Sequence, residues 1–551
     1  MRIFQNIHIV FLIACSVILI WLSQSVAANS AAVALRYETE GEAFSRILEK
    51  NELVIGVKSD YPPWGMYSED GSELIGLEID LAKDLAKSLG VDLTLIPVNS
   101  RNRLQKVEEG AVDVVIATMG DSDSRREQSG LLLPHYYSSG VALLSREDII
   151  FESWAQLVGR ELCLTSGAYY NNSIIERYKI KPVFFDGTRD TGYGVKTGQC
   201  IGWAYDNTSL EQLIRDGTWS GYGFKLPIIL PGAWAVAVSK AEQNSKFGAH
   251  VSNTIENWLR TGYILQLQDK WELPRSKFLV EQQEIFSRVD AESGNYHCVR
   301  SAEGNYPEDC QSEQILKTKV SIDAKPNIVE KVENALNLDF SPLFNVSVRQ
   351  LIIDGLLLTL LISASSIFGS ICISVVLLKL SLVRWAILRI FSSVIVSIFR
   401  STPPLILMYL TFFGLGSVVY NEYGLTVPSI AAAILVFSVY AGSGIAGVLI
   451  ATSRNMVSTK SEFTETPKPS IVQVFGDNIT AVVANCVNIV KATGLASTIA
   501  VPELITTSNS IVADWGNTAT MMHLLLLVYF VYVLCVVSII RNLVKLVMRH
   551  G

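Results

Sequence analysis

The chain has 551 residues, of which 49% are hydrophobic and 18% charged, and its formal net charge is −7. A negative net charge without a basic stripe argues against nucleic acid as a partner. The sequence contains no GxxxxGK[ST] phosphate loop, no CxxC pair and no metal-ligand spacing among its six histidines. We therefore expect no catalytic site, no metal and no cofactor, and any ATPase must come from another chain.

The N-terminus predicts an exported protein. A short basic start precedes an apolar run, Ile7–Leu22, and small residues at positions 25–27 offer a cleavage site. This pattern is typical of a secretory signal peptide over residues 1–27. An uncleaved signal anchor is the alternative, and either one exports the chain that follows.

Residues 50–285 predict a soluble solute-binding domain. Strand-like runs alternate with helical periodicity, which favours α/β layers over a length sufficient for two lobes. The first set comprises strands at Leu53–Val57, Leu93–Pro97, Val112–Thr118 and Val141–Ser145 and helices at Glu78–Leu89 and Arg101–Glu109. The second set comprises strands near Glu161–Leu164, Val183–Phe185, Ile201–Tyr205 and Ala233–Val238 and a final helix at Lys246–Leu267.

Four cysteines of the exported part predict two disulfide bridges. Cys163 and Cys200 lie in two short strand-like runs, and Cys298 and Cys310 bracket a loop that contains Gly, Asn and Pro. An oxidising compartment favours a bridge within each pair. The closely spaced second pair is a local staple, whereas the first pair requires a fold that brings its two strands together.

Residues 286–345 predict a linker, because they are charged, rich in loops and too poor in apolar residues for an independent core. We expect one short helix there, at Asn327–Leu336. Residues 346–549 predict an all-α transmembrane domain, since a membrane-spanning helix needs about 20 apolar residues. Its five apolar runs are Leu351–Leu378, Ile390–Leu415, Val427–Thr452, Ile479–Ala500 and Thr518–Ile540.

The loop charges orient these five runs. Lys and Arg are present after the first run, after the third run and in the C-terminal tail, while two other gaps contain neither residue. Short loops rich in Lys and Arg stay in the cytoplasm. We therefore expect a multi-pass inner (plasma) membrane protein whose solute-binding domain lies outside the cytoplasm, in the periplasm.

Three features of the soluble part could bind a zwitterion. The buried strand that ends at Thr118 is followed by a small-residue turn and Arg125, which suits a carboxylate. Tyr61 and Trp64 flank a Pro-Pro turn and could cover a ligand side chain or attract an ammonium group. Asp206, at a strand end of the second lobe, could pair with an ammonium group. Each feature alone also fits an ordinary structural role, as an exposed arginine, core packing or a helix cap.

The order of these motifs resembles the family 3 extracellular solute-binding proteins of ABC importers. The matching strings are Tyr61-Pro-Pro-Trp64, Gly76-Leu-Glu-Ile-Asp80-Leu-Ala82, Gly110-Ala-Val-Asp113, Thr118 to Arg125 and Gly198 to Asp206. In that family two α/β lobes close on an amino acid, so the resemblance implies a two-lobed periplasmic-binding-protein fold.

The same resemblance implies roles for single residues. Arg125, Thr118 and Gly120 would bind the α-carboxylate of an amino acid, with Gly120 offering only its backbone N–H. Asp206 would take the α-ammonium group, and Tyr61 and Trp64 would line the side-chain space. One further position, Ala168, stands where the family usually has a Thr. The ligand implied is a polar or charged amino acid.

The transmembrane domain resembles the permease subunits of polar amino-acid ABC importers, in the strings Arg400 to Leu405, Tyr409 to Gly416 and Lys491 to Leu504. This resemblance implies a homodimer or heterodimer of permease domains on a cytoplasmic ABC ATPase. Arg400 and Lys491 are candidate transport residues, since polar groups inside a membrane are costly. Alternatively, each side chain reaches the membrane interface from a helix end.

The cytoplasmic segment Met456–Pro469 departs from the permease family. Relatives carry a helical loop that docks into the ATPase, whereas this segment is short and contains two prolines that oppose a long helix. The sequence favours an ABC-type amino-acid importer driven by a separate ATPase. The alternative is a membrane-tethered amino-acid sensor whose permease-like domain is uncoupled from ATP hydrolysis.

Overall fold

In the computed structural model, the described residues are 42–215, 217–291, 294–301, 305–311, 315–316, 329, 331–333, 338, 340–460, 470–515 and 518–550. The chain forms two compact units. The first comprises Met1–Ser138, Gly232–Asn345 and Trp515–Thr520, and the second comprises Ser139–Pro231, Val346–Asp514 and Met521–Gly551. The expected signal peptide lies outside the described residues. Most of the expected linker helix does too, although its described residues, Val329 and 331–333, are helical.

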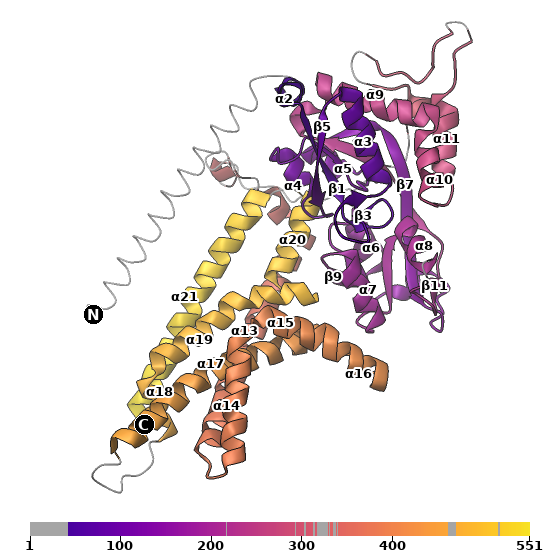
Figure 1. Ribbon diagram of the computed structural model, residues 1–551. Coiled ribbons are helices and arrows are strands. Elements are labelled where there is room, and N and C mark those ends of the chain that lie inside the picture. The colour runs from indigo at the N-terminus through magenta and orange to yellow at the C-terminus, as the bar shows by residue number, and fades with distance from the viewer. Residues whose placement is uncertain are drawn as a thin grey trace. The chain divides into compact units, whose positions relative to one another are not determined.

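The first unit is built on a mostly parallel sheet (Figure 1). Its strand order is β5 (Asp92–Val98), β1 (Glu52–Lys58), β6 (Val114–Ile116) and β12 (Ile229–Val238). β1 is parallel to β5 and β6, and β12 is antiparallel to β6. All three residues of β6 are buried, as expected for a central parallel strand. The register Val57↔Ile116 brings the carboxyl ends of β1 and β6 to the same sheet edge.

Helices and a small second sheet complete the first unit. α3 (Leu77–Leu89) packs on β1 and β5, and α4 (Arg103–Glu108) packs on β1 and β6. The remaining elements are α2 (Glu42–Lys50), β2 (Asp60–Tyr61), β3 (Gly65–Tyr67), β4 (Leu74–Ile75), α5 (Asp123–Gln128), η2 (Lys240–Glu242), α9 (Lys246–Thr261), α10 (Tyr263–Lys270), α11 (Lys277–Phe286), η3 (Glu308–Cys310) and η4 (Ser341–Phe344). The single helix expected at Lys246–Leu267 is wrong, because Gly262 adopts a left-handed φ of 69° and ends α9.

The second unit contains the other half of the α/β region. Its strands follow the order β7 (Gly130–Arg146), β10 (Gly202–Asp206), β8 (Glu161–Thr165) and β9 (Lys181–Phe185), and β11 (Tyr222–Phe224) also pairs with β7. β7 and β12 each run through both units, and β7 is much longer than the strand expected at Val141–Ser145. The helices are η1 (Trp154–Leu157), α6 (Asn171–Tyr178), α7 (Thr188–Lys196) and α8 (Asn207–Arg215).

Both disulfide bridges predicted from the sequence are present. Cys163 lies in β8 and Cys200 lies two residues before the start of β10, and the parallel pairing of these strands brings the two Cα atoms to 5.5 Å. Cys298 and Cys310 join across 12 residues of the segment that follows α11. The α/β region therefore carries one bridge within its sheet and one local bridge beyond it.

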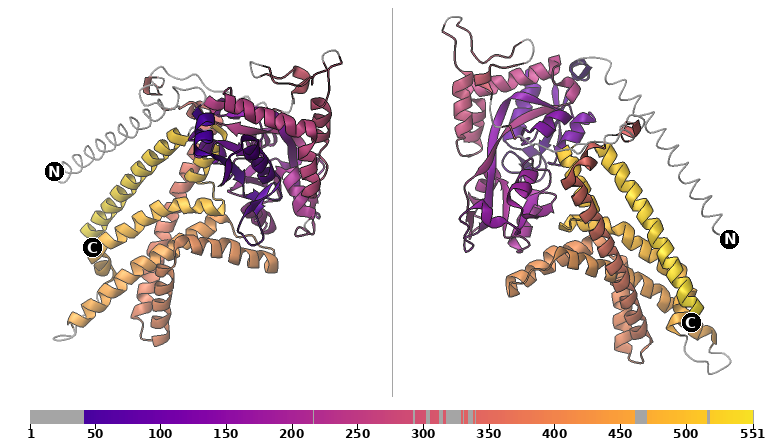
Figure 2. Two further views of the ribbon diagram at one scale, coloured as in Figure 1. Left: turned by 45° about the horizontal axis from the view of Figure 1, so that its top comes forward. Right: turned by 180° about the vertical axis from the view of Figure 1, so that it is seen from behind.

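The remainder of the second unit is helical (Figure 2). Its elements are α13 (Val346–Leu382), α14 (Ala386–Ser401), α15 (Pro404–Tyr409), the π-helical η5 (Leu410–Leu415), α16 (Gly416–Tyr423), α17 (Ser429–Lys460), α18 (Ile471–Asp477), α19 (Ile479–Ala492), η6 (Thr493–Ile499), α20 (Leu504–Trp515) and α21 (Thr518–His550). Within the described residues, five helical stretches are long and apolar enough to cross a membrane: Val348–Leu382, Pro404–Tyr423, Ser429–Met456, Ile479–Ile499 and Thr520–Ile539.

The second expected run, Ile390–Leu415, is not one helix. α14 ends at Ser401, and a new helix begins at Pro404. The two prolines at 403 and 404 explain the break, because proline lacks a backbone N–H and disfavours helix in the preceding residue. The third expected run, Val427–Thr452, corresponds to α17, which continues eight residues beyond Thr452, to Lys460. The rest of the Met456–Pro469 segment lies outside the described residues.

Small residues let α13 and α17 approach closely. A Cβ on Gly369 would lie 2.4 Å from the Ser438 hydroxyl oxygen, and a Cβ on Gly442 would lie 2.9 Å from the Ser370 carbonyl. Such contacts leave no room for larger side chains. Packing of small residues is typical of helix pairs in membranes.

Candidate functional site

The first-unit residues singled out from the sequence gather at one sheet edge. Tyr61 and Trp64 follow β1, Thr118 follows β6, and Arg125 belongs to α5, which starts five residues after Thr118. Because β1 and β6 are parallel and paired in register, their carboxyl ends lie side by side. Ligands of open α/β sheets bind at such carboxyl edges.

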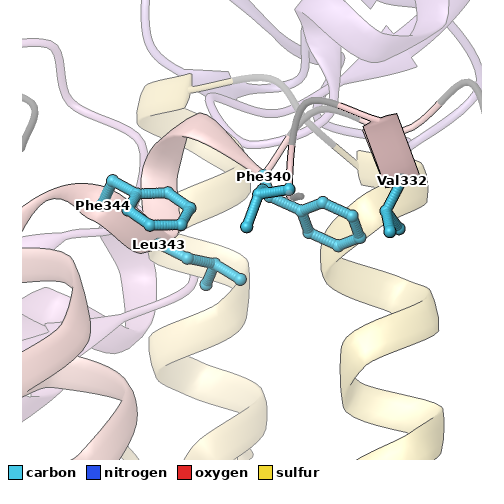
Figure 3. Close-up of a pocket in the computed structure, with 5 residues that line it drawn as sticks. Val332, Phe340, Leu343 and Phe344 are labelled. Atoms are coloured by element: carbon cyan, nitrogen blue, oxygen red, sulfur yellow. The ribbon is translucent and has the colours of Figure 1, made fainter. Parts of the chain in front are cut away.

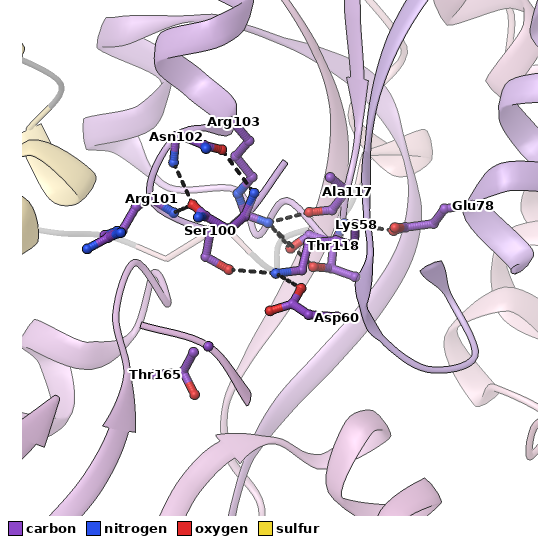
Figure 4. Close-up of polar contacts among 12 residues, drawn as sticks. Lys58, Asp60, Glu78, Ser100, Arg101, Asn102, Arg103, Ala117, Thr118 and Thr165 are labelled. Carbon is purple, nitrogen blue, oxygen red and sulfur yellow. Dashed lines mark hydrogen bonds and ion pairs between the residues drawn. The ribbon is translucent and has the colours of Figure 1, made fainter. Parts of the chain in front are cut away.

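The Thr118 turn is held on both sides of its peptide (Figure 4). Thr118 adopts a left-handed φ of 47°, which a β-branched residue rarely does. Its N–H donates to Glu78 Oε1 at 2.7 Å, and its carbonyl accepts from Arg103 Nη1 at 2.9 Å. These two buried side chains thus stabilise a conformation that the turn would not adopt alone. Neither the role of Glu78 nor that of Arg103 was predicted from the sequence.

Glu78 is a fully buried carboxyl group. Besides the Thr118 N–H, it accepts a hydrogen bond from the Tyr136 hydroxyl on β7. Burial raises the pKa of Glu78 to about 7, although the hydrogen bonds from Tyr136 and Thr118 and the charges of Arg103 and Lys58 act in the opposite direction. The side chain therefore titrates near neutral pH.

Arg125 is buried and points back to its own loop. Its Nη1 donates to the Gly120 carbonyl at 2.8 Å. Gly120 in turn pairs with Trp234 of β12 in an antiparallel bridge. The structure thus shows the Gly120 carbonyl in use by Arg125, while donation by the Gly120 N–H to a ligand stays a prediction.

A buried ion cluster anchors the start of α5. Asp121 accepts from Arg126 Nε and Nη2 at 2.8 and 2.6 Å, and His135 Nε2 lies 2.7 Å from the same carboxylate. Burial opposes ionisation of Asp121, but the hydrogen bonds from His135 and Arg126 outweigh it and lower the pKa. The loop that presents Arg125 is therefore tied to β7 through His135.

Four aromatic rings fill the space beside this loop. The Trp64 ring meets Tyr61 at 5.4 Å, Tyr137 at 5.8 Å and Trp234 at 5.9 Å between centroids, and Tyr137 stacks on Trp234 at 5.0 Å. All four side chains are buried. Edge-to-face contacts of this kind fix each ring relative to its neighbours.

Two candidate residues lie in the second unit. Asp206 is buried at the end of β10, where its Oδ1 accepts a hydrogen bond from the Ser139 hydroxyl at 2.8 Å. Ala168 is buried in the turn after β8, with its N–H directed to the Thr165 carbonyl at 3.3 Å. Their roles toward a ligand stay predictions.

The two candidate transport residues are exposed. Arg400 lies in the last turn of α14, and its Nη1 lies 3.2 Å from the point where a Cβ on Gly447 of α17 would be. Lys491 lies in the last turn of α19. Neither takes part in an ion pair with another described residue. Their part in transport stays a prediction.

An apolar cavity of about 230 Å³ precedes the helical region (Figure 3). It is lined by Val329, Val332, Phe340, Leu343 and Phe344. None of these side chains offers a charge or a hydrogen bond to a zwitterion. The cavity is therefore not a candidate amino-acid site.

One cluster of potential metal ligands also fails a chemical test. His297, Asp309 and Cys310 place one ligand atom each within 4.8 Å of one another. Cys310, however, is joined to Cys298 in a disulfide and offers no thiolate. His297 and Asp309 instead form an exposed pair at 3.0 Å.

Residues 53–274 match the family of bacterial extracellular solute-binding proteins, family 3. The N-terminal region thus has an α/β binding-protein fold, and the helical region lies beyond this match.

Two similar proteins are named for the amino acids that they bind. The chain is 31% identical over 102 residues to the L-cystine-binding protein of Escherichia coli, which covers 18% of this chain and 38% of the relative. It is 22% identical over 239 residues to an ABC transporter glutamine-binding protein of Bacillus subtilis, which covers 42% of this chain and 86% of the relative. The chain thus spans under two fifths of the first relative's length.

Solved structures are similar at lower identity. A mutant of ArgBP from T. maritima is 21% identical, with a TM-score of 0.39 and coverage of 42% of this chain and 99% of that one. An amino acid ABC transporter substrate-binding protein from Streptococcus pneumoniae bound to L-arginine is also 21% identical, with a TM-score of 0.38 and coverage of 42% and 100%.

Proposed function

We propose that residues 50–285 bind a polar or charged α-amino acid outside the cytoplasm, and that the helical region passes it across the membrane as a permease. The observation that carries the binding function is the buried Arg125 on a pre-formed loop beside the Thr118 turn. A guanidinium is well suited to bind a carboxylate with two parallel hydrogen bonds. In this proposal Arg125 exchanges its bond to Gly120 for the α-carboxylate.

Asp206 supplies the partner for the α-ammonium group in this proposal. Its Oδ1 accepts from the Ser139 hydroxyl, and an ionised carboxylate can accept several hydrogen bonds, so the α-ammonium group would add a charge-assisted one. Closure of two lobes on the ligand would be a hinge motion of the kind known for ligand-binding domains. Names of the relatives support an amino acid as ligand, because they include cystine-, glutamine- and arginine-binding proteins.

The transport function rests on the five candidate membrane spans and on the permease-like strings around Arg400 and Lys491. We infer that two permease domains pair, that a separate ATPase drives import, and that this chain is itself no enzyme. An exported binding domain at the N-terminal side of the first span fits the orientation given by the loop charges.

A tethered sensor is the second candidate function. It is favoured by the prolines at 467 and 469, which replace a long helical loop expected to dock into an ATPase. In that case ligand binding would change contacts of the helical region without transport.

Uptake by vesicles separates the two candidates. The full chain would be reconstituted into vesicles with candidate ATPase subunits. Accumulation of a radiolabelled amino acid would be measured with and without ATP on the side of the membrane that carries the ATPase. Import predicts ATP-dependent accumulation that Arg125→Ala abolishes. Ligand binding without ATPase association and without uptake would contradict the importer function and favour the sensor function.

A further inference from the structure

The side chain of the ligand can be inferred from hydrogen-bond donors next to the site. Lys58 ends β1, and its side chain is only 1% exposed. The register Val57↔Ile116 places Lys58 alongside Ala117, the residue before the Thr118 turn (Figure 4). An ammonium group thus lies at the same sheet edge as the proposed carboxylate site.

The Lys58 ammonium group has more N–H donors than it has acceptor partners among the described residues. Its Nζ pairs with Asp60 Oδ1 at 2.7 Å and donates to the Ser100 hydroxyl at 3.3 Å. A lysine ammonium carries three N–H donors and no acceptor. One donor is therefore available for an acceptor on a ligand.

Trp64 supplies a second donor. Its indole Nε1 is buried and has no hydrogen-bond acceptor among the described residues. Indole nitrogen only donates, and a buried donor without an acceptor is unfavourable. An acceptor from a bound molecule would satisfy it.

A tight hairpin joins these two donors. Tyr61 pairs with Gly65, and a Cβ on Gly65 would lie 2.2 Å from the Lys58 carbonyl oxygen, so only glycine fits beside Lys58. The carbonyl of Trp64 is fixed in turn, because it accepts from the Glu78 N–H at the start of α3 at 2.9 Å. The hairpin therefore holds the backbones of Lys58 and Trp64 in one rigid arrangement.

The acidic groups of the first unit near this edge each have at least one partner. Asp60 pairs with Lys58, Asp121 binds Arg126 and His135, and Glu78 accepts from the Thr118 N–H and the Tyr136 hydroxyl through Oε1, while its buried Oε2 has no hydrogen-bond partner among the described residues. A cationic ligand side chain would meet the like charge of Lys58, which disfavours it. An oxygen acceptor would not meet this repulsion.

We propose that Lys58 and Trp64 donate hydrogen bonds to the ligand side chain, and that the ligand is therefore an amino acid with a side-chain carboxylate or carboxamide rather than a cationic one. This inference rests on the proposed binding function. It departs from the L-arginine bound to the similar Streptococcus pneumoniae protein.

Calorimetric titration of the full chain in detergent with L-glutamate, L-glutamine and L-arginine tests the proposal. Wild-type protein should bind glutamate or glutamine at least ~10-fold more tightly than arginine, about 1.4 kcal/mol. Trp64→Phe should weaken binding of the preferred ligand ~10-fold, and Lys58→Met should weaken glutamate more than glutamine because it removes a charge.

Trp258→Phe is the matched control, since Trp258 Nε1 already donates to Asp84 at 2.6 Å and its loss should leave ligand preference unchanged. Tighter binding of arginine than of both other ligands would overturn the inference and leave the proposed function standing. Absence of binding by any of the three, and by the remaining standard amino acids, would contradict the proposed function itself. The wild-type preference decides the matter even where a variant fails to fold.

Discussion

The backbone N–H of Thr118 donates a hydrogen bond to the buried carboxyl group of Glu78 across 2.7 Å. This bond joins the N-terminal turn of α3 to the turn that follows β6, two elements separated by 40 residues. It supports a left-handed Thr118 next to the proposed carboxylate site. Several properties of the protein should depend on it.

Replacing Glu78 by Leu should weaken amino-acid binding by ~10-fold or more. The Thr118 N–H would lose its shorter buried hydrogen bond, to Glu78 Oε1, at a cost of about 1–3 kcal/mol, and would keep only the bond to the Tyr136 hydroxyl at 3.1 Å. Glu78→Gln keeps an acceptor oxygen and should remain within ~3-fold of wild type. Titration calorimetry gives both values. Asp80→Asn is the control, since Asp80 lies on the same helix but binds Lys270 and Trp271. Equal effects of the Leu and Gln variants would refute a positioning role for the acceptor.

The same carboxyl group predicts a pH dependence of stability. The pKa of Glu78 is about 7 in the folded chain, against 4.5 for an unperturbed glutamate, because burial disfavours the charged form. A raised folded-state pKa contributes stability that is complete below pH 4.5 and is lost as pH rises through 7. Relative to Glu78→Gln, wild type should lose roughly 3 kcal/mol between pH 4.5 and 8. Thermal unfolding followed by tryptophan fluorescence measures this difference, and parallel pH profiles would contradict it.

Arg125→Ala should abolish amino-acid binding, because the other guanidinium beside the Thr118 turn, that of Arg103, already donates to the carbonyls of Ala117 and Thr118. Arg125→Lys should bind more weakly than wild type, since an ammonium lacks the planar pair of donors. Binding is again measured by titration calorimetry, with circular dichroism as a check on folding. Arg215→Ala removes an exposed guanidinium from α8 and serves as the control. Unchanged affinity of Arg125→Ala would remove the proposed carboxylate contact.

The Cys163–Cys200 bridge should stabilise the soluble part more than the Cys298–Cys310 bridge. The first closes 37 residues and the second closes 12, and constraint of the unfolded chain grows with the length closed. Double alanine variants should lose about 4 and about 3 kcal/mol respectively. Denaturant unfolding of each variant checks the order. A larger loss from the shorter bridge would show that contacts of the folded state decide the effect.

The sequence predicted the order of α/β elements because period-two and helical patterns are local properties of the chain. It also predicted both disulfides. Cys298 and Cys310 are close in sequence, and Cys163 and Cys200 both lie in strand-like runs. The sequence did not predict the start of β7 at Gly130, because Leu131 to Tyr137, which are buried except for the half-buried Leu133, do not alternate between apolar and polar residues. Such a run does not distinguish strand from helix.

The candidate site was predictable only in part. Motif order pointed to Arg125, Thr118 and the aromatic pair, but the partners of these groups come from distant segments. Tyr137 and Trp234 meet Trp64 from β7 and β12, and no local spacing links these residues. The buried Glu78 could have been suspected, since an acidic residue at the start of an otherwise apolar helix face needs a partner.

We propose that the α/β region binds an amino acid through Arg125. The most direct test is calorimetric titration of the full chain in detergent with each standard amino acid and L-cystine, on wild type and Arg125→Ala in parallel. We expect saturable one-to-one binding of at least one polar or charged amino acid by wild type and no binding by the variant. Equal binding by both proteins, or none by wild type, would contradict this proposal.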